Sequence, residues 1–180
     1  MPIVLNGSGT VTGISVGGLP DGIVDGDTLA SGVGGKILQF QSIKYETYFS
    51  TSSTSFVDSG LTCNITPVSA SSKIAIVGRI QLTKINYTVG AQFLRDSTVI
   101  GSHSSTGTMT DLFTFYSGSQ YMSLGIPFMM DDLPNTTSQV TYKLQIRSDG
   151  GTGVIYVNGH NNNSGSYHSI SYMSLMEISA

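Results

Sequence analysis

The sequence predicts an all-β protein: an antiparallel β-sandwich of jelly-roll type, preceded by an extended, glycine-rich N-terminal arm. Apolar and polar residues alternate in short runs through most of the 180 residues, as expected for strands with one buried face. Only 11% of the residues are charged, 22 are Gly, and no segment has the period of an amphipathic helix. Eight or so strands in roughly 140 residues suit two packed sheets.

The first 35 residues differ from the rest and form the predicted arm. Their glycines are too frequent for a self-contained core. Apolar residues nevertheless recur between the glycines, at Val11, Ile14, Val16, Leu19, Ile23, Val24 and Leu29. Because a free linker would not need these side chains, we expect them to act in assembly by ordering the arm against another surface. The predicted domains are therefore an anchoring arm over 1–35 and a sandwich over 36–180.

The predicted sandwich consists of strands separated by turn-forming residues. In chain order we expect strands over 36–49, 55–65, 73–83, a hairpin over 91–100 with Asp96 and Ser97 near its tip, 111–116, 121–130, 138–147, 154–157 and 167–178. Pro134 and Asn135 predict a turn between two of them. The first and last of these strands are long and apolar. We expect them to pair centrally in the sandwich, so that the arm leaves from one end of the body.

Composition excludes several classes of partner. Eight Lys and Arg against eleven Asp and Glu give a net charge of −3, which leaves no basic patch for nucleic acid. No stretch approaches the ~20 apolar residues needed to cross a bilayer, so no membrane insertion is expected. The first residues lack the basic segment of a signal peptide. The single cysteine, Cys63, alternates with polar neighbours and is expected to be a small buried hydrophobe.

No motif predicts a catalytic residue. Residues 13–17 match the string around a hydrolase nucleophile, but the following Gly18, Leu19 and Pro20 cannot start the helix which that turn requires. A glycoside hydrolase needs two positioned carboxylates. The sequence has only two glutamates, Glu46 and Glu177, and both are predicted to lie in strands. We therefore expect no enzyme and no cofactor.

Metal binding is not predicted either. The three histidines have no short metal-ligand spacing. Asp21, Asp25 and Asp27 lie close together in the arm, but they lack the regular alternation and the distal Glu of an EF-hand loop. They are interpreted as turn-forming residues. Asp131 and Asp132 likewise predict a solvated turn.

Tyrosine-rich and asparagine-rich loops are the candidate ligand-binding segments. Aromatic rings can stack on sugars, and amides can hydrogen-bond to them. The candidate glycan contacts are Tyr116, Tyr121, His160 and Tyr167. The alternative interpretation is that these residues fill surface loops without binding anything.

Two stretches resemble a known group of proteins. Residues 6–13 (NGSGTVTG) and 18–22 (GLPDG) resemble the N-terminal part of tail-fibre-like virion proteins of marine and cyanobacterial tailed bacteriophages. Residues 61–67 (LTCNITP) and 71–74 (SSKI) are similar to the body that often follows in those proteins. The resemblance implies a homotrimeric appendage whose N-terminus docks on the particle and whose body faces outward, without catalytic residues. The short chain makes a capsid-decoration protein, a head fibre or a short spike alternatives to a tail fibre.

These observations lead to one main functional hypothesis. The chain is expected to be a non-enzymatic virion structural protein, made in the host cytoplasm, that assembles as a homo-oligomer with other virion proteins. Its body is expected to reach a host surface glycan. The alternative is a free carbohydrate-binding module, which would be a monomer with affinity for glycans.

Overall fold

The structure is a computed structural model that describes residues 4–5, 11–12, 37–84, 88–101, 112–116, 123–149, 153–160 and 168–180. The chain divides into two units, Met1–Lys36 and Ile37–Ala180, and each is described by itself. In the first unit, β1 (Val4–Leu5) pairs in antiparallel fashion with β2 (Val11–Thr12).

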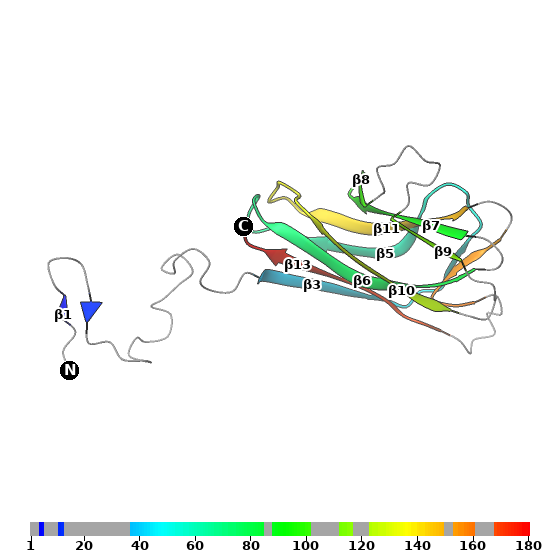
Figure 1. Cartoon of the computed structure of the whole chain (residues 1–180), viewed down its shortest axis with the longest axis horizontal. Coiled ribbons are helices and arrows are strands. Elements are labelled where there is room, and N and C mark those ends of the chain that lie inside the picture. Colours follow the sequence, from blue (N-terminus) through cyan, green and yellow to red (C-terminus); the bar gives the residue numbers. More distant parts are fainter. Residues whose placement is uncertain are drawn as a thin grey trace. The chain divides into compact units, whose positions relative to one another are not determined.

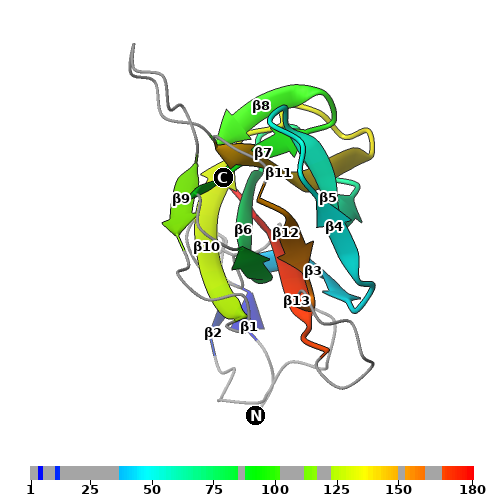
Figure 2. The same ribbon diagram turned by 90° about the vertical axis from the view of Figure 1, so that its right-hand side faces the viewer.

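The second unit confirms the all-β prediction. Its described residues form a six-stranded and a five-stranded antiparallel sheet (Figures 1 and 2). The first sheet contains β3 (Ile37–Tyr45), β4 (Phe49–Thr51), β6 (Lys73–Lys84), β10 (Leu124–Asp132), β12 (Ile155–Val157) and β13 (Ser171–Ile178). The second contains β5 (Val57–Ile65), β7 (Thr88–Arg95), β8 (Thr98–Gly101), β9 (Phe113–Tyr116) and β11 (Val140–Asp149).

The order of pairing is that of a jelly roll. β3 pairs with β13, β5 with β11, β6 with β10, and β7 with β8 and β9. The early strands thus pair with the late ones in reverse order, as in one long antiparallel ribbon. Pairing of β13 with β6 and of β11 with β7 then rolls this ribbon into two sheets. This nesting is the jelly-roll topology and confirms the predicted fold class.

The first and last long strands of the sandwich pair as predicted, but their position was predicted wrongly. Ser171 lies opposite Tyr45 at one end of the pair, and Ile178 lies opposite Ile37 at the other. β13 lies between β3 and β6, whereas β3 forms the edge of its sheet. Every residue of β3 keeps some exposure to solvent. The polar residues of this strand explain its position, because a central strand would have to bury them.

Side chains from both sheets meet in one core. β11 shows the expected alternation, with every second residue from Val140 to Ser148 buried. The ring of Phe93 in the second sheet lies 5.6 Å from that of Phe128 in the first, centroid to centroid. Cys63 is buried on β5, as predicted. The core also contains Leu61, Ile65, Ile74, Ile76, Ile80, Leu82, Val89, Ala91, Tyr142, Leu144, Ile146, Ile155, Val157, Met173 and Leu175.

The predicted hairpin tip is confirmed at Asp96, between β7 and β8. Asp96 has a φ of 54°, a left-handed conformation that Asp tolerates better than most residues. Its backbone N–H donates to the carbonyl of Thr141 at 2.7 Å. Its Oδ1 in turn accepts the backbone N–H of Thr141 at 2.9 Å. The turn is therefore fixed to the start of β11.

Gly78 gives a stability test of the first sheet. A Cβ at this position of β6 would lie 2.3 Å from the carbonyl oxygen of Tyr172 and 2.6 Å from Cζ of Phe128. We predict that Gly78→Ala lowers the free energy of unfolding by about 2 kcal/mol, because the sheet must shift to accept the methyl group. Urea unfolding measures this loss.

The matched control is Gly125→Ala in β10. A Cβ at Gly125 would meet only the ends of flexible side chains, with Nε2 of Gln81 at 3.1 Å and Cδ of Arg79 at 3.5 Å. This variant should unfold close to the unmodified protein. Equal stability of the two variants would contradict the packing described for Gly78.

Candidate functional site

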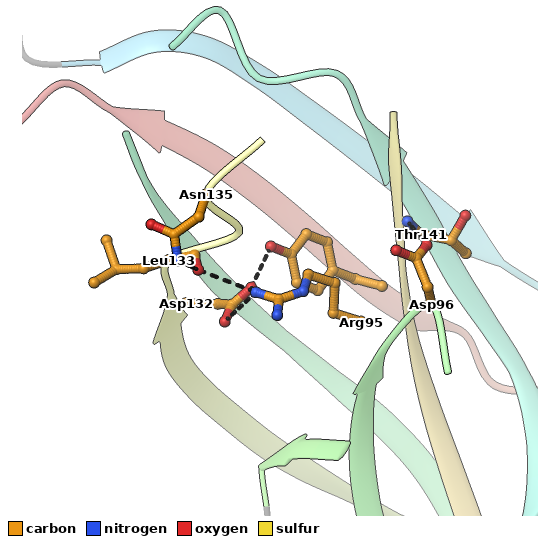
Figure 3. Close-up of polar contacts among 7 residues, drawn as sticks. Arg95, Asp96, Asp132, Leu133, Asn135 and Thr141 are labelled. Carbon is orange, nitrogen blue, oxygen red and sulfur yellow. Dashed lines mark hydrogen bonds and ion pairs between the residues drawn. The ribbon is translucent and has the colours of Figure 1, made fainter. Parts of the chain in front are cut away.

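A polar cluster joins the two sheets at one end of the sandwich (Figure 3). Arg95 comes from β7, Tyr142 from β11 and Asp132 from the end of β10. Nη1 of Arg95 donates to both carboxylate oxygens of Asp132, at 3.0 and 2.8 Å, and to the carbonyl of Leu133 at 3.1 Å. The hydroxyl of Tyr142 donates to Oδ2 of Asp132 at 2.7 Å. One carboxylate of the first sheet is thus bound by two side chains of the second.

The hydrogen bonds of this cluster link the two sheets. Burial and the hydrogen bond to Asp132 raise the pKa of Tyr142 far above its ordinary value, so its hydroxyl remains a donor. The Asp132 side chain is 11% exposed and both of its oxygens accept hydrogen bonds. A carboxylate so occupied is poorly placed to take a proton from a substrate.

The predicted solvated turn at Asp131 and Asp132 was therefore wrong. Both residues belong to β10 and pair with β6. Alternation along the strand turns Asp132 toward Arg95, whereas Asp131 faces solvent and forms an ion pair with Lys73 at 2.8 Å. Nothing local in the sequence marks this difference, because the partner Arg95 lies far away along the chain.

A buried asparagine holds the irregular part of the first sheet. Asn158 follows β12, is fully buried and has a φ of 57°. Its Nδ2 donates to the carbonyls of Tyr45 at 2.9 Å and Thr47 at 3.2 Å. Its Oδ1 accepts the hydroxyl of Ser171 at 2.7 Å, and its backbone N–H donates to Gln81 at 3.1 Å. Asn158 was not predicted from the sequence, although Asn before Gly after a short strand is a turn signal.

Glu177 is a buried carboxylate with a structural role. Its Oε1 accepts the backbone N–H of Val68 at 2.8 Å and that of Ser69 at 3.2 Å. Its Oε2 accepts Nε2 of Gln39 at 2.6 Å. Burial alone would raise the pKa of Glu177, but the hydrogen bonds from Gln39, Val68 and Ser69 outweigh burial and hold it below its usual value. The carboxylate therefore fastens the loop after β5 to β13.

The two glutamates lie in different surroundings. Glu177 lies in β13 as predicted, but Glu46 directly follows β3 and is not in a strand. Glu46 is exposed and forms an ion pair with Lys44 at 2.8 Å. One carboxylate is thus enclosed by donors and the other is solvated.

Lys84 is a fully buried cation at the end of β6. Its Nζ donates to the carbonyl of Thr88 at 3.0 Å and to the hydroxyl of Ser148 on β11. Burial lowers the pKa of Lys84 to about 8, against the opposing charge of Asp149. This side chain therefore ties β6 of the first sheet to the second sheet.

The structure places few of the predicted assembly and glycan residues. Val11 lies in β2, and Ile14, Val16, Leu19, Ile23, Val24 and Leu29 lie outside the described residues. Tyr116 ends β9, opposite Thr88. Tyr121 and Tyr167 lie outside the described residues. His160 is only 8% exposed, so its ring offers little surface for stacking on a sugar.

The outer face of the first sheet carries exposed apolar side chains between polar and charged ones. Alternation along β13 directs Met173 and Leu175 into the core and Met176 outward. Across the strands, Phe40 lies opposite Met176, and Met129 of β10 lies opposite Val77 of β6. Phe40 is 57% exposed and Met129 is 81% exposed. We call this surface the apolar face, and define it by Ile37, Phe40, Val77, Met129, Tyr172, Met176 and Ile178.

The outer face of the second sheet is polar and internally bonded. Asp58 accepts Nζ of Lys143 at 3.1 Å and Nε2 of Gln145 at 2.6 Å. Gln92 donates from Nε2 to Oε1 of Gln145 at 2.7 Å. These groups form a ladder across β5, β11 and β7. The two outer faces of the sandwich therefore differ, and the apolar face is the candidate functional surface.

The described part of the chain contains neither a metal-binding cluster nor a membrane-spanning helix. Among those residues, no group of three or more His, Cys, Asp or Glu side chains is arranged to hold a metal ion. The same residues contain no helix long and apolar enough to cross a membrane.

Comparison with known proteins finds similarity only among solved structures. No protein-family model matches the sequence, and no curated protein matches it. Similar structures include infectious bursal disease virus, Gt strain, with 14% identity and a TM-score of 0.40 over 79% of this chain and 38% of the viral chain. For the T13 viral particle of the same virus the identity is 14% and the TM-score 0.40, over 79% of this chain and 36% of the viral chain. For the VP2 subviral particle of this virus the identity is 16% and the TM-score 0.40, over 79% of this chain and 37% of the viral chain.

The chain spans about two-fifths of the length of those viral chains. The three similar structures come from a virus, and none of them is described as a phage tail fibre.

Lys84 predicts a defined pH dependence of stability. Its folded pKa of about 8 lies below the ordinary 10.5, so the unfolded chain binds more protons between these two values. The unmodified protein should therefore gain stability relative to Lys84→Met as the pH rises from about 8 to about 10.5. Urea unfolding of both proteins across this range measures the difference. A difference independent of pH would contradict the burial of a protonated Lys84.

Glu177 predicts a pH dependence of stability in the acidic range. We expect Glu177→Gln to cost about 2 kcal/mol at neutral pH, because an amide cannot accept from all of the donors that surround the carboxylate. Since the folded pKa is depressed, this stability is present above pH 4.5 and is lost as the pH falls through the folded value. Thermal unfolding from neutral to acidic pH measures the loss. The exposed Glu46→Gln is the control and should change stability little; equal effects of the two variants would refute the role of Glu177.

Proposed function

We propose that this chain is a non-enzymatic structural subunit of a bacteriophage particle, docked through its N-terminal arm over 1–35. Within that role we propose a trimeric fibre or spike, or a capsid-decoration subunit, located on the virion. The observation that supports this function most is the contrast between the apolar face and the polar outer face of the second sheet. A body that served only to enclose its own core would not need an apolar outer face.

The charged groups of the sandwich support a structural role. Asp132 and Glu177 accept hydrogen bonds on both oxygens, and Lys84 donates to groups of the second sheet. Each of these side chains joins strands or loops. These three charged side chains thus have structural partners.

The arm supplies the second support. Its seven apolar residues stand between glycines, and the arm continues directly into β3, whose apolar residues are exposed. We propose that Val11, Ile14, Val16, Leu19, Ile23, Val24 and Leu29 pack against another subunit of the particle. Contact with a host glycan is proposed for Tyr116, Tyr121 and Tyr167.

Removal of the arm tests the proposal. A chain lacking residues 1–35 should keep its strand content by circular dichroism but should no longer enter particles assembled with the other virion proteins. Immunoblots of purified particles measure incorporation.

A full-length variant with Val11, Ile14 and Val16 changed to Ser should show the same loss, because the apolar contacts are gone while the length is kept. Ser8→Ala with Thr10→Ala is its control and should incorporate normally. Incorporation of the truncated chain at the level of the full chain would refute the anchoring role.

A further inference from the structure

The edges of the two sheets are protected to different extents. Unpaired strand edges promote association, and proteins usually block them with charges, Pro, bulges or short strands. β10 carries Pro127, Asp131 and Asp132, and β5 carries Asp58 and Gly60, which has a φ of 90°. β8 and β9 have four residues each, and β4 has three.

β3 lacks most of these devices. Its nine residues include no Pro and a single charge, Lys44. One extra residue, Leu38, lies between the partners of Glu177 and Ile178 and makes one bulge near its start. Among the strands that the structure describes, β3 is therefore the long edge with the least protection. Figure 1 shows it at the border of its sheet.

Large apolar side chains cluster on this edge. Exposed fractions reach 57% for Ile37, 43% for Leu38, 57% for Phe40 and 37% for Ile43. Phe40 and Ile37 also belong to the apolar face through their pairing with β13. The open edge and the apolar face thus form one continuous surface.

Two lysines on this surface are paired with carboxylates, and an arginine lies against an aromatic ring. Lys44 pairs with Glu46 at 2.8 Å, and Lys73 pairs with Asp131 at 2.8 Å. The guanidinium of Arg79 lies 5.8 Å from the ring centroid of Tyr172. A strongly charged partner would find little electrostatic attraction here. A partner with few charges and exposed apolar side chains fits better.

Building on the structural role proposed above, we propose that the apolar face and the open edge of β3 dock a second copy of this chain. A second copy brings an extended strand of the same length, whose backbone can pair with the free edge of β3. It also brings the same exposed apolar side chains, and Lys44 and Lys73 enter the contact already paired with carboxylates. Phe40 on β3 and Met129 on β10, two strongly exposed apolar side chains of this face, mark the two sides of the expected contact.

Sedimentation velocity of the full chain tests this surface. The unmodified protein should sediment as an oligomer at micromolar concentrations. Phe40→Glu and Met129→Lys should each weaken association by at least about tenfold, because they place a charge in an apolar contact. Both sites are exposed in the single chain, so circular dichroism should show an unchanged fold.

The matched control is Val99→Glu on β8 of the second sheet. Val99 is 43% exposed, so this variant adds a charge at an exposed apolar residue outside the proposed contact. It should sediment like the unmodified protein. Hydrogen exchange provides a second measurement: the amides of β3 should be protected in the oligomer and should exchange rapidly in Phe40→Glu.

Three results would overturn the proposed surface. One is a monomeric unmodified protein, including one whose β3 amides are protected by its own arm. Another is an oligomer that survives both face variants, and the third is an oligomer that Val99→Glu disperses equally well. Particle incorporation is measured separately. If Phe40→Glu disperses the oligomer but no form of the chain enters particles, the docking surface stands and the virion role fails.

Discussion

The carboxamide of Asn158 is the contact on which the arrangement of the first sheet depends. Between β3 and β4, and between β12 and β13, the chain leaves regular pairing at the same level of the sheet. Backbone groups freed there would be costly to bury without partners. Asn158 binds the carbonyls of Tyr45 and Thr47 and the hydroxyl of Ser171. It thereby lets β3 end and β4 begin, while β3 stays paired with β13 and β4 stays paired with β12.

That arrangement determines which surface is left open. With β3 held only by β13 on one side, its other edge and its apolar side chains remain exposed. The described residues of the second sheet form no equivalent surface, because Asp58, Lys143 and Gln145 bind one another on its outer face. The polarity of the sandwich is thus a consequence of strand order combined with alternation along each strand. The association proposed above would use the surface that this geometry leaves open.

The sequence was a good guide to the strands and a poor guide to their long-range partners. The prediction over 138–147 succeeded, because β11 alternates without interruption and begins after a turn. The edge position of β3 was not foreseen, since the bulge at Leu38 disturbs alternation and apolar content alone favours a central strand. Asp132 was misjudged for a different reason. Its partners Arg95 and Tyr142 reach it only after β7, β10 and β11 have been brought together by the roll of the ribbon.

The low charge of the chain takes on a physical meaning in this fold. Asp132 and Glu177 are used inside the body, where each binds several donors. On the apolar face, Lys44 and Lys73 are each matched by an acid nearby. Two copies that approach through this face would therefore meet only the weak, screened repulsion of their Arg79 guanidinium groups. Their association would depend mainly on the apolar area that they bury and on strand pairing along β3, and should consequently respond weakly to salt.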